Sequence, residues 1–200
     1  MAKRGRSKSS PVVDGASRRY YLGVDPGIAG AMALLDSKEN SVTFFDMPTQ
    51  RVMVNRVRRN RIDHLALDAL VDLELSVLQS ELAIVIEGIV PIMRMSGKQA
   101  DRGGNFRVAT TNMSLGVAKG AIFQALAKLY LVPREVYPIS WKKEFLVEGK
   151  EGAVAVAKEL YPGAEITLQK HHARAEALLL AEYGRREDAG ELVRSRVNRK

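Results

Sequence analysis

The chain has 200 residues, 46% of them hydrophobic, which suits one domain with a substantial core. No apolar run approaches the length that spans a bilayer, so no membrane partner is expected, and the lack of cysteine excludes disulfides, thiolate zinc sites and a cysteine nucleophile. The formal net charge of +8 indicates a polyanionic partner such as nucleic acid, because Lys and Arg displace the counterions condensed on phosphates.

The first residues are basic and contain no apolar segment of a secretory signal. Met1 to Ser10 is rich in Arg, Lys and Ser and has no acid. We expect residues 1–19 to form a basic flexible arm or to include the remnant of a processed transit peptide. Residues 20–186 are predicted to form one domain, and residues 187–200 a charged tail.

The segment from Tyr20 to Asp36 predicts two antiparallel strands joined by a tight Pro-Gly turn. The first strand is apolar and ends on Asp25. An unpaired carboxylate in a buried strand costs roughly several kcal/mol, so Asp25 either caps the turn or has a cation as its partner. Ser41 to Met47 alternates like a third antiparallel strand.

The segment from Arg51 to Arg61 holds five arginines and no acid. Such a run is often a solvated loop. Because the whole chain is basic and this segment contains no counter-charge, the run also fits an arm that contacts DNA. On the second interpretation, the DNA contacts of this arm are Arg56, Arg58 and Arg59.

A helix is expected next, capped by Asp63 and reaching about Ser80. The continuous apolar run from Leu82 to Ile86 predicts a strand covered on both faces. The run ends on Glu87, which is followed by a glycine. The first strand has the same construction, because its apolar run to Val24 is also followed by an acid and, shortly after, a glycine.

The second half of the chain predicts further helices around a long loop. The loop, Pro91 to Phe106, is of a length that is usually functional or disordered. Helices are expected over Thr111 to Tyr130, briefly from Ser140, from Gly149 to Leu160 and from about Lys170, with a short strand at Glu135 to Pro138. Gly116 and Gly120 would allow close approach of another backbone to the first of these helices. The residues expected to face DNA from the loop and the later helices are Arg94, Lys98, Gln99, Arg102, Arg107, Lys142 and Lys143.

This order of elements predicts an α/β fold, one five-stranded mixed sheet with helices on both faces. A right-handed crossover would place the strand that ends on Glu87 parallel to and beside the strand that ends on Asp25, at one edge of the sheet. His172 and Glu176 are four residues apart and lie on one helical face. Three carboxylates and an imidazole suit Mg²⁺ or Mn²⁺, and two such ions can hydrolyse a phosphodiester.

Several short blocks carry a family resemblance between about Tyr20 and Gly184. They are Gly23-Val24-Asp25-Pro26, Gly30-Ala31, Gly97-Lys98-Gln99, Trp141-Lys142 and Arg174-Ala175-Glu176-Ala177-Leu178-Leu179. With them the chain resembles the RuvC-like Holliday junction resolvases of the ribonuclease H fold, and most of all their plastid branch, the monokaryotic-chloroplast resolvases.

The resemblance implies a homodimeric endodeoxyribonuclease that resolves a four-way DNA junction by paired symmetric nicks, with two Mg²⁺ or Mn²⁺ ions per active site. It implies that Asp25, Glu87, His172 and Glu176 bind the metals and that Lys150 assists at the scissile phosphate. It also implies the chloroplast nucleoid as the compartment in a eukaryote, and the cytoplasm otherwise. Two features depart from the plastid branch: Ala100-Asp101-Arg102 replaces the aromatics after Gly-Lys-Gln, and His171 stands where an Asp is usual.

Two other functions stay open on the sequence. An actin-like ATPase or sugar kinase also begins with a strand reading D-x-G, but needs a second Gly-rich phosphate loop, for which Asp101 to Gly104 is a poor candidate. A non-catalytic module on a decayed nuclease fold would bind branched DNA without cutting it. DNA cleavage that depends on a divalent metal separates both from a nuclease.

Overall fold

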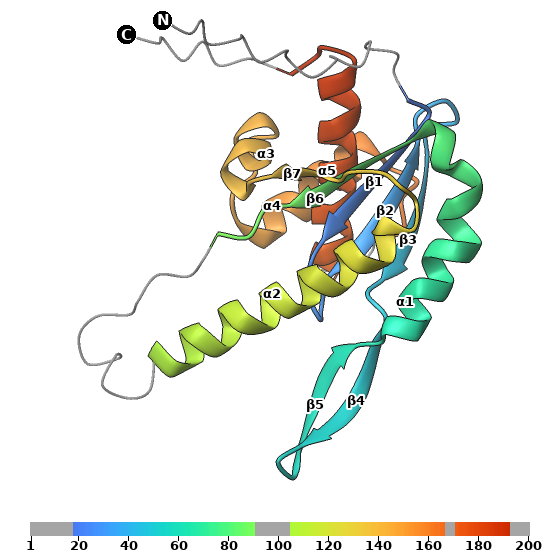
Figure 1. Ribbon diagram of the computed structural model, residues 1–200. Coiled ribbons are helices and arrows are strands. Elements are labelled where there is room, and N and C mark those ends of the chain that lie inside the picture. Colours follow the sequence, from blue (N-terminus) through green and yellow to red (C-terminus); the bar gives the residue numbers. More distant parts are fainter. Residues whose placement is uncertain (1–17, 91–104, 167–170, 193–200) are drawn as a thin grey trace, which may run out of the picture.

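The computed structural model describes residues 18–90, 105–166 and 171–192. A five-stranded mixed sheet lies at its centre, with the strand order β3-β2-β1-β6-β7 (Figure 1). β1 (Tyr20–Asp25), β2 (Ala31–Asp36) and β3 (Ser41–Asp46) form an antiparallel meander, while β6 (Leu82–Glu87) pairs in parallel with β1, and β7 (Arg134–Val136) in parallel with β6. This order and these directions are those of the ribonuclease H-like fold, so the predicted fold class is confirmed.

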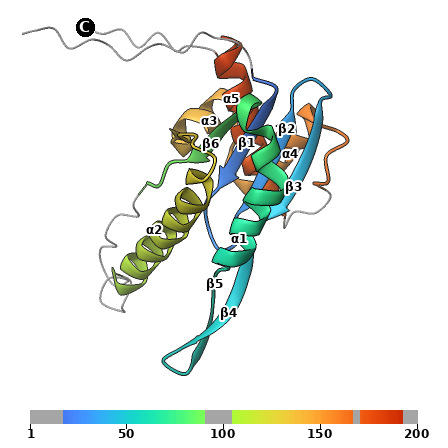
Figure 2. The ribbon, with the colours of Figure 1, turned by 45° about the vertical axis from the view of Figure 1, so that its right-hand side comes forward.

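Alternation along the central strands creates two hydrophobic cores, one on each face of the sheet. Tyr21 and Val85 face the core that contains α4 (Gly149–Leu160) and α5 (His172–Asp188). Leu22 and Ile84 face the other core, together with α1 (His64–Leu70) and α2 (Asn105–Ala127). Helices therefore cover both faces, as predicted, and Figures 1 and 2 show α5 and α2 on opposite sides of β1 and β6.

The helix predicted from Asp63 is present, and its cap is confirmed. The Asp63 carboxylate accepts a hydrogen bond from the Ala66 N–H over 3.1 Å. The helical path continues beyond α1 through a π-helical turn (Val71–Leu75) and a 3-10 helix (Ser76–Glu81) to the start of β6.

Two features of the middle of the chain differ from what the sequence suggests. Residues 51–61 lie in an antiparallel hairpin of β4 (Thr49–Val54) and β5 (Val57–Ile62), so their interpretation as a solvated loop is wrong, whereas their interpretation as an arm that contacts DNA stays a prediction. α2 begins at Asn105 rather than near Thr111. Neither Gly116 nor Gly120 of this helix is approached by another described backbone, since a Cβ built on either would meet nothing within 4 Å.

The short helix expected from Ser140 is α3 (Pro138–Glu144), which begins with a proline in its first turn, where no N–H is needed. Most of the predicted arm (residues 1–19) and tail (residues 187–200) lies outside the described residues. In the described part of the chain, no helix is both long and apolar enough to cross a membrane.

Candidate active site

Two acidic residues end neighbouring parallel strands at one edge of the sheet. The register places Val24 of β1 opposite Ile86 of β6, so Asp25 and Glu87 follow as the next residue of each strand. Both continue the alternation of Tyr21 and Val85, which face α5. The sheet therefore presents Asp25 and Glu87 at one edge, on the side of α5.

α5 brings a third acid to this face because it packs against the backbone of β1. A Cβ on Gly23 would lie 1.9 Å from the Ala177 carbonyl oxygen, so only glycine permits this approach of helix and strand. Glu176 immediately precedes Ala177 and is only 9% exposed. The burial of an acid is costly unless it has partners, which makes the surroundings of Glu176 informative.

α3 supplies a partner to two of these acids through consecutive residues. The Trp141 indole Nε1 donates a hydrogen bond to Glu87 Oε1 over 3.0 Å, and Trp141 is fully buried. Lys142 Nζ lies 3.2 Å from Glu176 Oε1. Lys142 was predicted to contact DNA; in this structure its ammonium group neutralises the buried Glu176 carboxylate.

Burial raises the pKa of the Glu87 carboxyl above its ordinary value, and the negative charge of Glu176 raises it further. The hydrogen bond from Trp141 opposes this rise, as do the charges of Lys142 and Lys119. The effect of the Glu176 charge on Glu87 shows that residues almost ninety positions apart share one electrostatic environment.

Lys119 is a second cation near this site and was not among the predicted site residues. It lies on α2, is 9% exposed, pairs with Glu135 Oε2 over 2.5 Å and lies 5.5 Å from the centre of the Phe123 ring. Its position among the apolar residues of α2 was an available signal, because a lysine on a core-facing helix surface needs a partner.

The donor set fits a hard divalent cation in its chemistry, since Glu87 and Glu176 offer carboxylate oxygens from adjacent elements. However, the described residues contain no group of three His, Asp or Glu side chains arranged to hold a metal ion. His172 is the first residue of α5 and is half-buried. Lys150 lies in the first turn of α4, and its side chain is outside the described residues.

The residues expected to contact DNA fall into three groups. Arg56, Arg58 and Arg59 lie on the exposed β4–β5 hairpin, and Lys143 is exposed on α3. Arg107 lies in the first turn of α2, and its side chain is not among those described. Residues of the loop after β6 lie outside the described part of the chain, namely Arg94, Lys98, Gln99 and Arg102.

A cavity of about 430 Å³ lies beside the β1–β2 turn and is lined by Gly30, Asp46, His171 and Arg174, among others. Arg174 binds Asp46 through two hydrogen bonds of 2.7 Å. His171 is half-buried, and its Nδ1 is enclosed, with no hydrogen-bond partner among the described residues.

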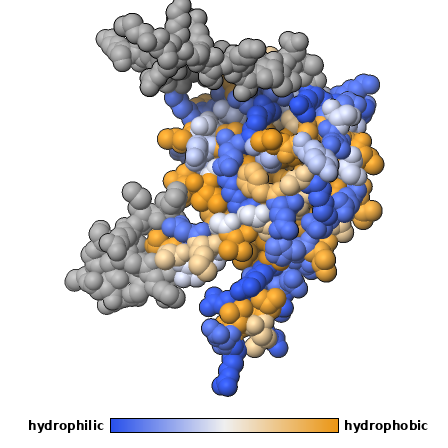
Figure 3. All heavy atoms as spheres, in the orientation of Figure 1, coloured by the Kyte–Doolittle hydropathy of each residue, from blue (hydrophilic) through white to orange (hydrophobic). Residues whose placement is uncertain are grey.

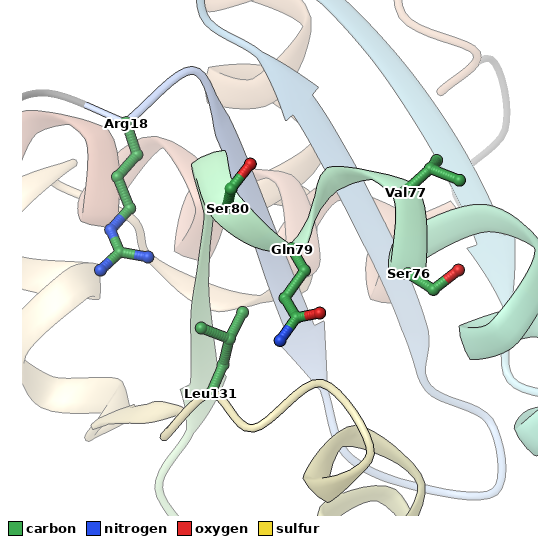
Figure 4. Close-up of a pocket in the computed structure, with 6 residues that line it drawn as sticks. All are labelled: Arg18, Ser76, Val77, Gln79, Ser80 and Leu131. Carbon is green, nitrogen blue, oxygen red and sulfur yellow. The ribbon is translucent and has the colours of Figure 1, made fainter.

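A larger cavity, of about 530 Å³, lies at the opposite end of the strands (Figure 4). Arg18 and Gln79 line it, and the side chains of both donate hydrogen bonds to backbone carbonyls. Arg18 donates to the Leu82 carbonyl, and Gln79 donates to the Leu129 carbonyl over 2.7 Å. Among the residues that the structure describes, no acid lines this cavity. The candidate active site is therefore the edge with the carboxylates.

Fold and site together define an α/β protein of ribonuclease H-like topology with acidic residues gathered at the end of its central parallel strands. No protein-family model matches the chain, and no curated protein matches it. Two solved structures from Thermus thermophilus are similar, each aligned over 86% of this chain and 98% of the other. RuvC in complex with a Holliday junction substrate is 13% identical with a TM-score of 0.49, and a second RuvC structure is 16% identical with a TM-score of 0.48.

Proposed function

We propose that this protein is a metal-dependent endonuclease that resolves four-way DNA junctions by paired symmetric nicks. The observation that carries the proposal is the convergence of Glu87 and Glu176 at the edge where Asp25 ends β1. One short helix contacts both acids: Trp141 donates a hydrogen bond to Glu87, and Lys142 forms an ion pair with Glu176. A cation bound next to carboxyl groups favours their ionised form, because it offsets the repulsion between their negative charges. The formal net charge of +8 supports a nucleic-acid substrate.

In this proposal Asp25, Glu87, Glu176 and His172 hold two Mg²⁺ or Mn²⁺ ions. When bound, the ions supply an activated water and charge stabilisation for the departing oxygen. Trp141 orients Glu87 through its hydrogen bond, and Lys142 is close enough to this edge to contact a phosphate there. Lys150 is assigned to the scissile phosphate.

Paired symmetric cutting needs two active sites, so we infer a homodimer with two-fold symmetry. The solvent-facing side of α2 supports an association surface: Met113 and Val117 are 71% and 61% exposed, and Gly116 and Gly120 leave open space between and beside them. These residues are spaced three and four apart and form one stripe. Sedimentation of the protein with and without junction DNA measures the association.

The test is cleavage of three labelled substrates, a four-way junction, a linear duplex and a single strand, each with Mg²⁺, Mn²⁺ or chelator. We expect cutting of the junction alone, and only with metal. Asp25→Asn should bind the junction and not cut it, whereas Glu159→Gln, an exposed acid on α4, should cut normally. Failure of the unaltered protein to cut any substrate, or full cutting by Asp25→Asn, contradicts the proposal.

One observation favours a second candidate, a module that binds branched DNA without cutting it. Lys142 already neutralises Glu176, and the described residues form no ready cluster of three metal ligands. Tight junction binding with equal strength in Mg²⁺ and in chelator, and no cleavage in either, supports this candidate.

A further inference from the structure

The β4–β5 hairpin is a projection that contributes only its root to the core. In β5, the five residues from Val57 to Arg61 are exposed and only Ile62 is buried. The root is closed by a backbone hydrogen bond from the Asp63 N–H to the Pro48 carbonyl, over 3.0 Å. Both views show the hairpin extending away from the sheet (Figures 1 and 2). Core packing therefore does not explain why the chain forms it.

The projection is strongly cationic on both of its faces. The register places Arg58 opposite Met53 and Arg59 opposite Val52, so successive arginines point to opposite sides of the ribbon. Figure 3 shows hydrophilic residues over the end of the hairpin, with a hydrophobic patch beside them. Within the described residues, no ion pair neutralises any of its five arginines, which are Arg51, Arg56, Arg58, Arg59 and Arg61.

The root of the hairpin lies at the same edge of the sheet as the candidate active site. Asp46, at the end of β3, is opposite Ala31, which is itself opposite Asp25. The next residue, Met47, donates its N–H to the Gly30 carbonyl in the β1–β2 turn over 3.0 Å. A phosphate backbone bound at this edge therefore runs beside the root of the ribbon.

We propose that the β4–β5 hairpin enters the major groove of one duplex arm of the bound DNA. The major groove, about 12 Å wide, admits a two-stranded ribbon as it stands, whereas the minor groove, about 6 Å wide, must first be widened at a cost in DNA deformation energy. Six residues per strand give a reach of about 20 Å, or roughly six base pairs from the active-site edge. The inference rests on the proposed function, because it takes branched DNA to be the substrate.

The experiment measures affinity in chelator, so that it does not depend on cleavage. The substrates are four-way junctions with arms of about twenty base pairs, and junctions in which each arm is capped by a loop after about five. The double variant Arg58→Ala/Arg59→Ala is compared with Arg58→Lys/Arg59→Lys, which keeps the charge. The double variant Lys38→Ala/Lys158→Ala removes two exposed lysines, of which Lys38 lies in the β2–β3 turn at the opposite edge.

We expect the arginine-to-alanine variant to bind the long-arm junction roughly tenfold more weakly at 0.1 M salt, with a salt slope shallower by up to about two. Its affinity for the capped junction should change much less. The lysine-substituted variant should keep most of the slope, and the Lys38/Lys158 variant should match the unaltered protein. Methylation of guanine N7, which lies in the major groove, should weaken binding of the unaltered protein at positions in the arm.

Two results overturn the inference about the hairpin. In the first, the arginine-to-alanine variant loses as much affinity for the capped junction as for the long-arm junction. In the second, guanine methylation weakens DNA binding by this variant as much as it weakens binding by the unaltered protein. Either leaves the nuclease proposal standing if the junction is still cut in Mg²⁺. Failure of the unaltered protein to bind any junction instead removes the basis of both.

Discussion

The indole N–H of Trp141 is bonded to the carboxylate of Glu87 over 3.0 Å, so the single tryptophan of the chain touches one of the acids at the candidate active site. The bond joins α3 to the end of β6, two elements far apart in sequence. It also places a fluorescent reporter in contact with a proposed metal ligand.

The first prediction uses this reporter. Titration with Mg²⁺ should change the Trp141 emission of the unaltered protein, because the ion alters the charge next to the indole. Trp141→Phe keeps most of the packing but removes the donor, and should lower metal affinity or activity about 10- to 100-fold, as losses of groups that orient a metal ligand do. A Mg²⁺ titration that leaves the emission unchanged while supporting cleavage would contradict the role of Trp141.

The second prediction concerns stability and pH. Burial raises the pKa of Glu87, so the folded state binds this proton more tightly than the unfolded state does. The stability that this tighter binding contributes is present below the unfolded pKa and is lost as pH rises through the folded pKa. Glu87→Gln, which mimics the protonated form, should therefore be more stable than the unaltered protein at pH 7 and no more stable near pH 4. Denaturant unfolding at the two pH values measures the difference.

Glu182 provides the matched control, because its pKa moves the other way. Burial alone would raise that pKa, but hydrogen bonds from Arg185, Arg186 and Tyr161 outweigh burial and lower it. Glu182→Gln should therefore destabilise the protein at pH 7, by about 1–3 kcal/mol, and the penalty should shrink as pH falls through the folded pKa. Changes of the same sign in both variants at pH 7 would contradict this account of the two acids.

The third prediction concerns the contact between β1 and α5. Gly23→Ala would force a methyl group against the Ala177 carbonyl and should cost about 1–3 kcal/mol or more in the free energy of unfolding. Gly116→Ala is the control, since it lies on a helix with open space around it and should stabilise the monomer by about 0.5–1 kcal/mol. Equal effects of the two substitutions would show that the close packing at Gly23 is not what holds α5 in place.

The fourth prediction concerns the tip of the hairpin. Asn55 and Arg56 both have positive φ, 49° and 61°, as a two-residue type I′ turn requires, and the second position usually carries glycine. Arg56→Gly should relieve about 1–2 kcal/mol of strain and, after the entropy that glycine loses on folding, gain about 0.5 kcal/mol in stability. Its DNA affinity should fall because a cation is removed.

The matched change Arg58→Gly, in the strand, should instead lose stability, by about 0.5–1 kcal/mol. If Arg56→Gly also lost stability, the turn conformation would not be the reason for the strain. Thermal unfolding of the two variants in one buffer decides between these outcomes.

The sheet and its acidic edge were predictable because their signals are local. Apolar runs ending on Asp25 and Glu87 identify two strands, and the right-handed crossover rule then places them side by side. The hairpin was not predicted because β5 has hydrophobic residues only at its ends. The turn between β4 and β5 also lacks the glycine that is typical of a type I′ turn. The partners that Trp141 and Lys142 find also have no local signal, since they depend on how α3 docks against β6 and α5.

The hairpin joins the domain at a point where Pro48 and Asp63 are already bridged by their own backbones. Deletion of the hairpin would leave two chain ends that are already within hydrogen-bonding distance. The length and the charge of the hairpin can therefore change without a change in the sheet. If the protein acts on branched DNA as proposed, substitutions confined to this hairpin should alter its DNA contacts while Asp25 and Glu87 keep their places at the ends of β1 and β6.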